Sequence, residues 1–237
     1  MPRALIIAHG QPSDPGPAAL SLAALAKKVE ARMEGWTIGA ATLAEPGALA
    51  RAADGGSGLV FPMFMAGGWF TKVHIPARLA EAGAVGWTVL EPFGCDPALH
   101  DLCVTLASEA EARTVLLAAH GSFKSAVPSD IARHVAGRIA AETGARVLTG
   151  FIDQAPQLST LTGLDRDAVC LPFFAADGGH VSEDIPKALM EAGFQGRILP
   201  PVGLDARVPD LIAAAIVRGR PVCAAACRWA ADARTSA

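Results

Sequence analysis

Residues 3–10 read Arg-Ala-Leu-Ile-Ile-Ala-His-Gly, and residues 114–121 read Thr-Val-Leu-Leu-Ala-Ala-His-Gly. Each stretch is a short apolar run that ends in His-Gly, at His9 and at His120. A second stretch also occurs twice, as Phe-Pro-Met-Phe-Met-Ala-Gly-Gly-Trp-Phe at 61–70 and as Leu-Pro-Phe-Phe-Ala-Ala-Asp-Gly-Gly-His at 171–180. The copies lie 110 or 111 residues apart, and a register held over this length indicates a duplicated unit.

Each copy alternates short apolar runs with amphipathic segments, which predicts an α/β fold. Strands that are apolar throughout are typical of a parallel sheet with helices on both faces. We therefore expect two similar lobes, each with a four-stranded parallel sheet. The predicted strands are 4–8, 37–42, 58–64 and 87–90, then 114–119, 146–151, 168–174 and 197–199. The predicted helices are 17–33, 48–53, 75–82 and 97–110, then 129–142, 156–161, 183–192 and 205–218.

The repeat also predicts the domain organisation. We expect an N-terminal lobe at 1–111, a C-terminal lobe at 112–218 and an extension at 219–237, of which residues 232–237 should be frayed. No apolar run reaches the roughly 18–20 residues that a membrane span needs, and Met1-Pro2-Arg3 leads into a strand rather than into a signal peptide.

Composition narrows the function classes further. A net charge of −3 and a pI near 6.1 give no reason to expect nucleic acid or an anionic membrane as partner. Five cysteines, an odd number at irregular spacing, argue against a disulfide scaffold and for a cytoplasmic location. Cys223 and Cys227 would share one helix face, as a metal or redox pair or as two small buried side chains. The second alternative is favoured, because no further ligand lies nearby in sequence.

Two histidines in the second copy form the candidate site. His120 follows the first strand of that copy and His180 follows the third. With the strand order 2-1-3-4 these strands are neighbours, and their carboxyl ends flank the crevice where such sheets bind ligands. Gly121, Gly178 and Gly179 let the backbone turn sharply beside them. Neutral imidazole binds divalent iron, cobalt or nickel and also accepts protons.

The first copy lacks this pair. His9 keeps its place, but the position of His180 is occupied by Phe70. His74 could replace the missing histidine from one turn further on, or it could start a helix at the position of Asp184, which we expect to be an N-cap residue. A single histidine after a strand is more often structural than functional, so the expectation of a site depends on the pair in the second copy.

The His-Gly motif and the run Leu-Pro-Phe-Phe-x-x-x-Gly-Gly-His-x-x-x-Asp-Ile-Pro at 171–186 resemble the sirohydrochlorin chelatases, the class II cobaltochelatases and ferrochelatases. The resemblance implies insertion of cobalt, iron or nickel, as a substrate and not as a resident cofactor, into a tetrapyrrole. It implies that His120 and His180 bind the metal and accept pyrrole protons, and that Glu183 assists them. Tetrapyrrole contacts are expected from the surrounding loops, at Gly121, Ser122, Lys124, Gly178 and Gly179.

Other functions fit the sequence less well. A histidine phosphatase needs an arginine beside its nucleophile, but Ala8 and Ala119 precede the two histidines. Neither a dinucleotide-binding glycine motif nor a phosphate-loop motif occurs. The main alternative is a non-catalytic tetrapyrrole-binding or metal-binding relative with the same fold. We expect a monomer or a weak homo-oligomer.

Overall fold

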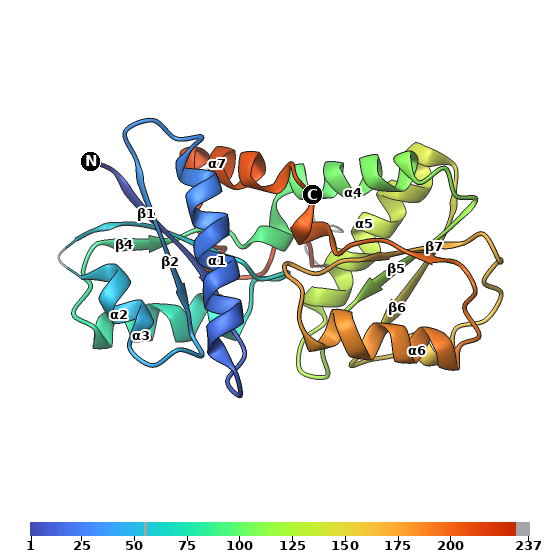
Figure 1. Ribbon diagram of the computed structural model, residues 1–237. Coiled ribbons are helices and arrows are strands. Elements are labelled where there is room, and N and C mark those ends of the chain that lie inside the picture. The colour runs from blue at the N-terminus through green and yellow to red at the C-terminus, as the bar shows by residue number, and fades with distance from the viewer. Residues whose placement is uncertain (55, 231–237) are drawn as a thin grey trace. The chain divides into compact units, whose positions relative to one another are not determined.

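The computed structural model describes residues 1–54 and 56–230, so the predicted frayed end lies outside the described residues. The described strands form two parallel sheets of four strands each (Figure 1). The first sheet has the order β2-β1-β3-β4, with β1 at Arg3–Ala8, β2 at Thr37–Thr42, β3 at Gly58–Pro62 and β4 at Trp87–Val89. The second has the order β6-β5-β7-β8, with β5 at Thr114–Ala119, β6 at Arg146–Phe151, β7 at Val169–Pro172 and β8 at Arg197–Ile198. The predicted fold class is confirmed, and both sheets have the strand order that was assumed in predicting the candidate site.

The first sheet is covered by helices on both faces. Because side chains alternate along a strand, Leu5 and Ile7 of β1 face one way and Ala4 and Ile6 the other. Leu5 and Ile7 pack with α2 (Ala48–Ala53) and α3 (Ile75–Glu81). The opposite face is covered by α1 (Pro15–Glu30) and α7 (Val208–Arg218), which lie side by side in Figure 1.

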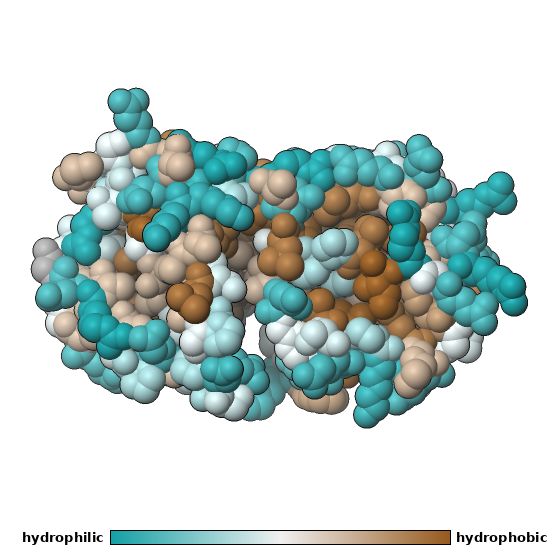
Figure 2. Space-filling view, viewed as in Figure 1, coloured by the Kyte–Doolittle hydropathy of each residue, from teal (hydrophilic) through white to brown (hydrophobic). Residues whose placement is uncertain are grey.

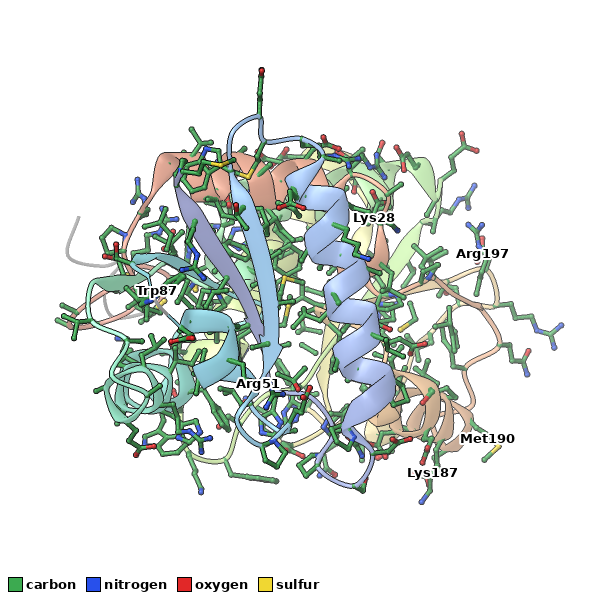
Figure 3. The ribbon with its side chains drawn as sticks, turned by 60° about the vertical axis from the view of Figure 1, so that its left-hand side comes forward. Lys28, Arg51, Trp87, Lys187, Met190 and Arg197 are labelled. Atoms are coloured by element: carbon green, nitrogen blue, oxygen red, sulfur yellow. The ribbon has the colours of Figure 1, made fainter. Side chains whose placement is uncertain are left out.

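The second sheet repeats this arrangement. Leu116 and Ala118 of β5 pack with α6 (Ile185–Glu191), which buries Ile185 and Leu189. Lys187 and Met190 project from the other side of α6 into solvent (Figure 3). The remaining helices are α4 (Pro97–Glu109) and α5 (Val127–Thr143), which pack against each other.

The compact units differ from the expected lobes, because each copy's last helix packs in the other copy's unit. One unit contains Met1–Asp96 with Ala206–Ala225, and the other contains Pro97–Asp205 with the described residues from Ala226. In the second unit Asp101 of α4 pairs with Arg138 of α5, Oδ1 to Nη1, at 2.6 Å. In the first unit Asp210 of α7 pairs with Arg32, just after α1, also at 2.6 Å. The repeat boundary near residue 111 is therefore not the boundary of a compact unit.

One predicted helix is absent. Residues 156–161 contain only the 3-10 turn η3 (Leu158–Thr160). The backbone N–H of Phe151 donates to the carbonyl oxygen of Pro156 (2.9 Å), and Phe151 also forms a parallel bridge with Gln157. The chain therefore bends back over residues 152–156 to bring Gln157 beside Phe151, and the segment forms no helix comparable to α2.

The described part of the extension, residues 219–230, contacts both units. In the first unit Pro221 forms an antiparallel bridge with Leu90, and the N–H of Val222 donates to the carbonyl oxygen of Val89 (3.0 Å). In the second unit Trp229 stacks on His134 at a ring-centroid distance of 4.5 Å. In the described part of the chain, no helix is long and apolar enough to cross a membrane.

Gly203 tests the packing that both copies share. A Cβ atom there would overlap the carbonyl oxygen of Ala175. The turn cannot move away easily, because the Gly203 N–H donates to the carbonyl oxygen of Phe174 (2.9 Å). We expect Gly203→Ala to lower the free energy of unfolding by about 1–3 kcal/mol through overpacking. Gly137→Ala is the control: Gly137 is exposed on α5 with no atom in the way, so alanine should raise stability by about 0.5–1 kcal/mol. Urea unfolding measures both, and equal effects would contradict the packing argument.

The buried cysteines make a second prediction about the fold. Burial raises the pKa of the Cys170 thiol to about 12 and also raises the pKa of Cys103. Only the thiolate reacts readily, so both side chains should resist iodoacetamide at pH 8 in the native protein. Cys223 is only half-buried and should be alkylated first. Peptide mapping after a short exposure, with and without urea, measures this, and native labelling of Cys170 would contradict it.

Candidate functional site

His120 is presented by the turn that follows β5, a strand buried along its whole length. The chain turns at Gly121, where φ is +74°, a conformation that residues with a Cβ atom rarely adopt. A Cβ atom there would also lie 2.6 Å from Cγ of Gln154. Gln154 Oε1 accepts a hydrogen bond from the Ser122 N–H at 2.8 Å, which fixes the turn. Glycine is therefore required where the chain leaves the strand beside His120.

His180 reaches the same edge of the sheet from β7. The two strands pair in parallel, with Ala118 opposite Pro172. After β7 a loop through Gly178 leads into a single π-helical turn, His180–Asp184, which continues into α6. Isolated π turns are rare in helices and are frequent at functional sites. The histidine therefore stands at the first position of a locally widened turn, a feature that the sequence pattern does not predict.

The two imidazoles face each other through their Nε2 atoms. These atoms are 3.1 Å apart, the ring centroids are 4.5 Å apart, and the ring planes are nearly perpendicular at 88°. Two nitrogens bound at about 2.0–2.1 Å to one metal ion lie about 2.9 Å apart at a right angle and about 3.3 Å apart at the tetrahedral angle. The observed separation falls between these values. With 41% and 49% of their side chains exposed, both histidines remain accessible to a ligand.

The outer ring nitrogens face oxygen atoms. Nδ1 of His180 lies 2.7 Å from Oδ2 of Asp184. Nδ1 of His120 lies 3.1 Å from the carbonyl oxygen of Gly121 and 3.5 Å from Oδ2 of Asp153. Phe174 lies near both rings, at centroid distances of 6.5 and 6.4 Å. The sequence pattern did not predict that Asp153 would lie near His120 or that Asp184 would contact His180. Asp184 follows His180 by four residues, a spacing that places two side chains on the same side of a helix and could have indicated this contact.

The other predicted site residues surround this pair. Glu183 is exposed in the π turn, but the carboxylate that bonds to His180 is that of Asp184. Asp184 does not act as the expected N-cap, because its side chain makes no capping hydrogen bond to α6. Ser122 Oγ accepts a bond from the Lys124 N–H (3.1 Å), and Lys124 is exposed. A Cβ atom at Gly178 or Gly179 would meet nothing within 4 Å, so both glycines border open space.

The corresponding place in the first copy is filled by aromatic rings. The Phe70 ring contacts His9 edge-on at a centroid distance of 4.9 Å. His74 precedes α3 at its N-cap position, as expected of a helix-start residue, although its side chain makes no capping hydrogen bond and its ring stacks on Trp69 at 4.7 Å. Trp69 is 60% exposed. In the view of Figure 2, the most extensive hydrophobic surface lies over the second unit, between α4 and α6. The first copy therefore presents aromatic groups at the position where the second presents paired nitrogen ligands.

No larger metal cage is present among the described residues. Within them, no group of three or more His, Cys, Asp or Glu side chains could hold a metal ion. The five cysteines form no disulfide within the described part of the chain, with Cys227 buried and Cys223 half-buried. The histidine pair can therefore supply two ligands to a metal ion and leave its other coordination positions open.

Comparison with known proteins gives the chain a family context. The CbiX family model matches residues 114–218, the part that contains both histidines. The chain is similar to the solved structure of CbiX, the terminal enzyme for biosynthesis of siroheme in denitrifying bacteria. The two are 44% identical with a TM-score of 0.85, over 91% of this chain and 98% of that chain. No curated protein matches the chain.

Two more distant structures share the fold. SirB from Bacillus subtilis with Fe3+ is 15% identical, with a TM-score of 0.69 over 99% of this chain and 98% of that chain. The sirohydrochlorin chelatase SirB from Bacillus subtilis subspecies spizizenii, in complex with cobalt, is 16% identical, with a TM-score of 0.66 over 92% of this chain and 95% of that chain. At these identities the likeness concerns the fold alone.

Proposed function

The chain belongs to the CbiX family, and we propose that it is a chelatase that inserts cobalt or ferrous iron into sirohydrochlorin or a related tetrapyrrole. The main support is the pair of Nε2 atoms of His120 and His180, 3.1 Å apart at the ends of neighbouring strands. The similarity to CbiX extends over nine-tenths of the chain, which supports the same class of reaction.

The pair suits the two tasks of a chelatase. His120 and His180 bind the incoming metal ion through Nε2 and leave its remaining positions to water and then to the pyrrole nitrogens. Two ligands hold the ion less firmly than a closed four-ligand site, so it can pass to the macrocycle. The ring must lose two N–H protons as the metal enters, and a base must lie at one face to accept them. An imidazole that has released the metal is such a base, and Glu183 is the nearby carboxylate that accepts the proton in turn.

Capture of the tetrapyrrole involves the loop after His120. Sirohydrochlorin has many carboxylates, so a positive charge at the rim attracts it. Lys124 is exposed four residues after His120, next to Phe123, whose side chain is 79% exposed. Ser122, Gly178 and Gly179 provide backbone that the macrocycle can approach closely, whereas Gly121 is buried and serves the turn.

Several attributes complete the proposal. The metal is a substrate and not a resident cofactor, and imidazole and carboxylate ligands suit cobalt, iron and nickel alike. Five cysteines, an odd number at irregular spacing, favour a reducing, cytoplasmic location. We assign neither nucleic acid nor membrane as partner, and a monomeric or weakly associated state.

A second candidate is a non-catalytic carrier of tetrapyrrole or metal with the same fold. It is favoured by the first copy, where Phe70 and His74 stand in place of His180 and Asp184. A carrier binds its ligand without converting it, so turnover separates the two functions. Multiple turnovers of sirohydrochlorin with cobalt or ferrous iron are expected of the chelatase, and stoichiometric binding alone would favour the carrier.

Turnover also tests the histidine pair. We expect His180→Ala to remove most chelation, because it deletes a metal ligand and a base together. His120→Ala should be about as severe, and the double variant little worse than either, since residues that act as a unit are not additive. His9→Ala is the matched control at the corresponding strand end, and its effect should be mild. Initial rates of metal insertion measure this, and equal losses for His9→Ala and His120→Ala would contradict a site confined to the second copy.

Lys124 gives a prediction about substrate capture. Lys124→Glu should raise the KM for sirohydrochlorin, because repulsion replaces attraction at the rim. The increase should be larger at low ionic strength, where exposed charges are screened less. Lys187→Glu makes the same charge change on the outer side of α6 and is the control. Initial rates at two salt concentrations measure the KM of both variants. If Lys124→Glu and Lys187→Glu have the same KM, Lys124 does not contribute to substrate capture.

A further inference from the structure

The carboxylate of Asp184 is directed at the outer nitrogen of His180. Oδ2 lies 2.7 Å from Nδ1, which is the length of a charge-assisted hydrogen bond. The two residues begin and end the same π turn, so the contact spans four residues within one rigid segment. Asp184 is half-exposed and makes no capping hydrogen bond to α6, so capping does not account for its orientation.

This contact determines which nitrogen of His180 bears the proton. An ionised carboxylate only accepts hydrogen bonds, so Nδ1 of the neutral ring must be the donor. The lone pair is then on Nε2, the atom that faces His120. At His120 the atom 3.1 Å from Nδ1 is the carbonyl oxygen of Gly121, again an acceptor. Both inner nitrogens therefore present lone pairs to the same point, an arrangement that a metal cation satisfies.

We propose that Asp184 is the positioning residue of the metal site: it fixes the tautomer and the ring orientation of His180 so that Nε2 is ready to bind the incoming ion. The proposal deepens the proposed function and rests on it. Histidine ligands in metal sites commonly donate their second N–H to a carboxylate, which orients the ring and makes it more basic. Asp153 is 3.5 Å from His120 Nδ1, beyond hydrogen-bond length, so Asp184 is the carboxylate in direct contact with a ligand.

The first copy supports the link between the histidine ligand and the carboxylate that positions it. His9 ends its strand as His120 does, and its ring lies 4.9 Å from that of Phe70, close to the 4.5 Å between His120 and His180. The frame of the site is thus retained in both copies. The first copy lacks both the ligand and the carboxylate, with Phe70 and His74 at the two positions. The histidine and the carboxylate therefore occur together in one copy and are both absent from the other.

Cobalt binding without tetrapyrrole tests the proposal directly. We expect Asp184→Ala to raise the Kd for Co2+ about 10–100-fold, the usual effect of losing such a partner. Asp184→Asn keeps an oxygen acceptor for Nδ1 and should recover part of this loss. Glu191→Gln removes an exposed carboxylate from the end of α6 and should leave the Kd unchanged. Titration followed by the visible absorption of bound cobalt gives each Kd, and circular dichroism confirms that each variant is folded.

A spectroscopic readout separates positioning from a structural role. In the metal-free protein, long-range imidazole 1H–15N spectra should show the Nδ1–H tautomer of His180, and Asp184→Ala should lose that preference. Unchanged Co2+ affinity or an unchanged tautomer in folded Asp184→Ala would overturn the proposal. A wild-type chain that does not turn over sirohydrochlorin, but whose Co2+ affinity falls in Asp184→Ala, would refute the chelatase function and leave the positioning role intact.

The first copy offers a complementary test by gain of binding. In a chain with His120→Ala and His180→Ala, Phe70→His supplies a second imidazole beside His9. Adding His74→Asp supplies the carboxylate at the repeat-equivalent position of Asp184. We expect the chain with both first-copy changes to bind Co2+ at least about tenfold more tightly than the chain with Phe70→His alone. Equal affinities of the two chains would contradict the requirement for the carboxylate.

Discussion

The parallel pairing of β5 with β7 is the constraint on which the site depends. It places Ala118 opposite Pro172 at the carboxyl edge, so the two chain segments leave the sheet side by side. Sixty residues of sequence separate His120 from His180, yet their Nε2 atoms are 3.1 Å apart. Only the backbone ladder of a buried sheet holds such distant segments in fixed register. The complete burial of β5 and β7 stabilises that ladder. The apolar core of the sheet therefore also fixes the position of the two histidines.

Much of the fold and of the site could be predicted from the sequence, because the two copies of the repeat can be compared with each other. The repeat identified the strands, and the strand order then brought His120 and His180 to one edge. The π turn at His180–Asp184 could not be predicted, because residues on a widened turn have the same apolar pattern as the start of an ordinary helix. For that reason Asp184 was expected to cap α6 and Glu183 to serve the site, whereas the carboxylate in contact with His180 is that of Asp184.

The missing helix at 156–161 and the exchanged helices have a different physical reason. Local patterns report which face of a helix is apolar, but not which sheet that face covers. α4 follows β4 in sequence and has a buried face containing Leu99 and Cys103, which any sheet could accept. The ion pair between Asp101 of α4 and Arg138 of α5 joins residues far apart in sequence, so the hydrophobic pattern of either helix does not reveal it. The register of Phe151 with Gln157 is likewise a tertiary contact, and it overrides the helical tendency of the segment.

The exchange of helices gives the copy without the histidine pair a structural role in the unit of the site. The unit that contains His120 and His180 is completed by α4, which is encoded at the end of the first copy. α7, encoded at the end of the second copy, completes the unit of the first. Neither copy by itself therefore encodes the compact unit built on its own sheet, and loss of the first would remove the helix that packs on α5. The first copy therefore contributes a helix to the unit of the site, while its own strand ends present the aromatic cluster around Phe70 in place of metal ligands.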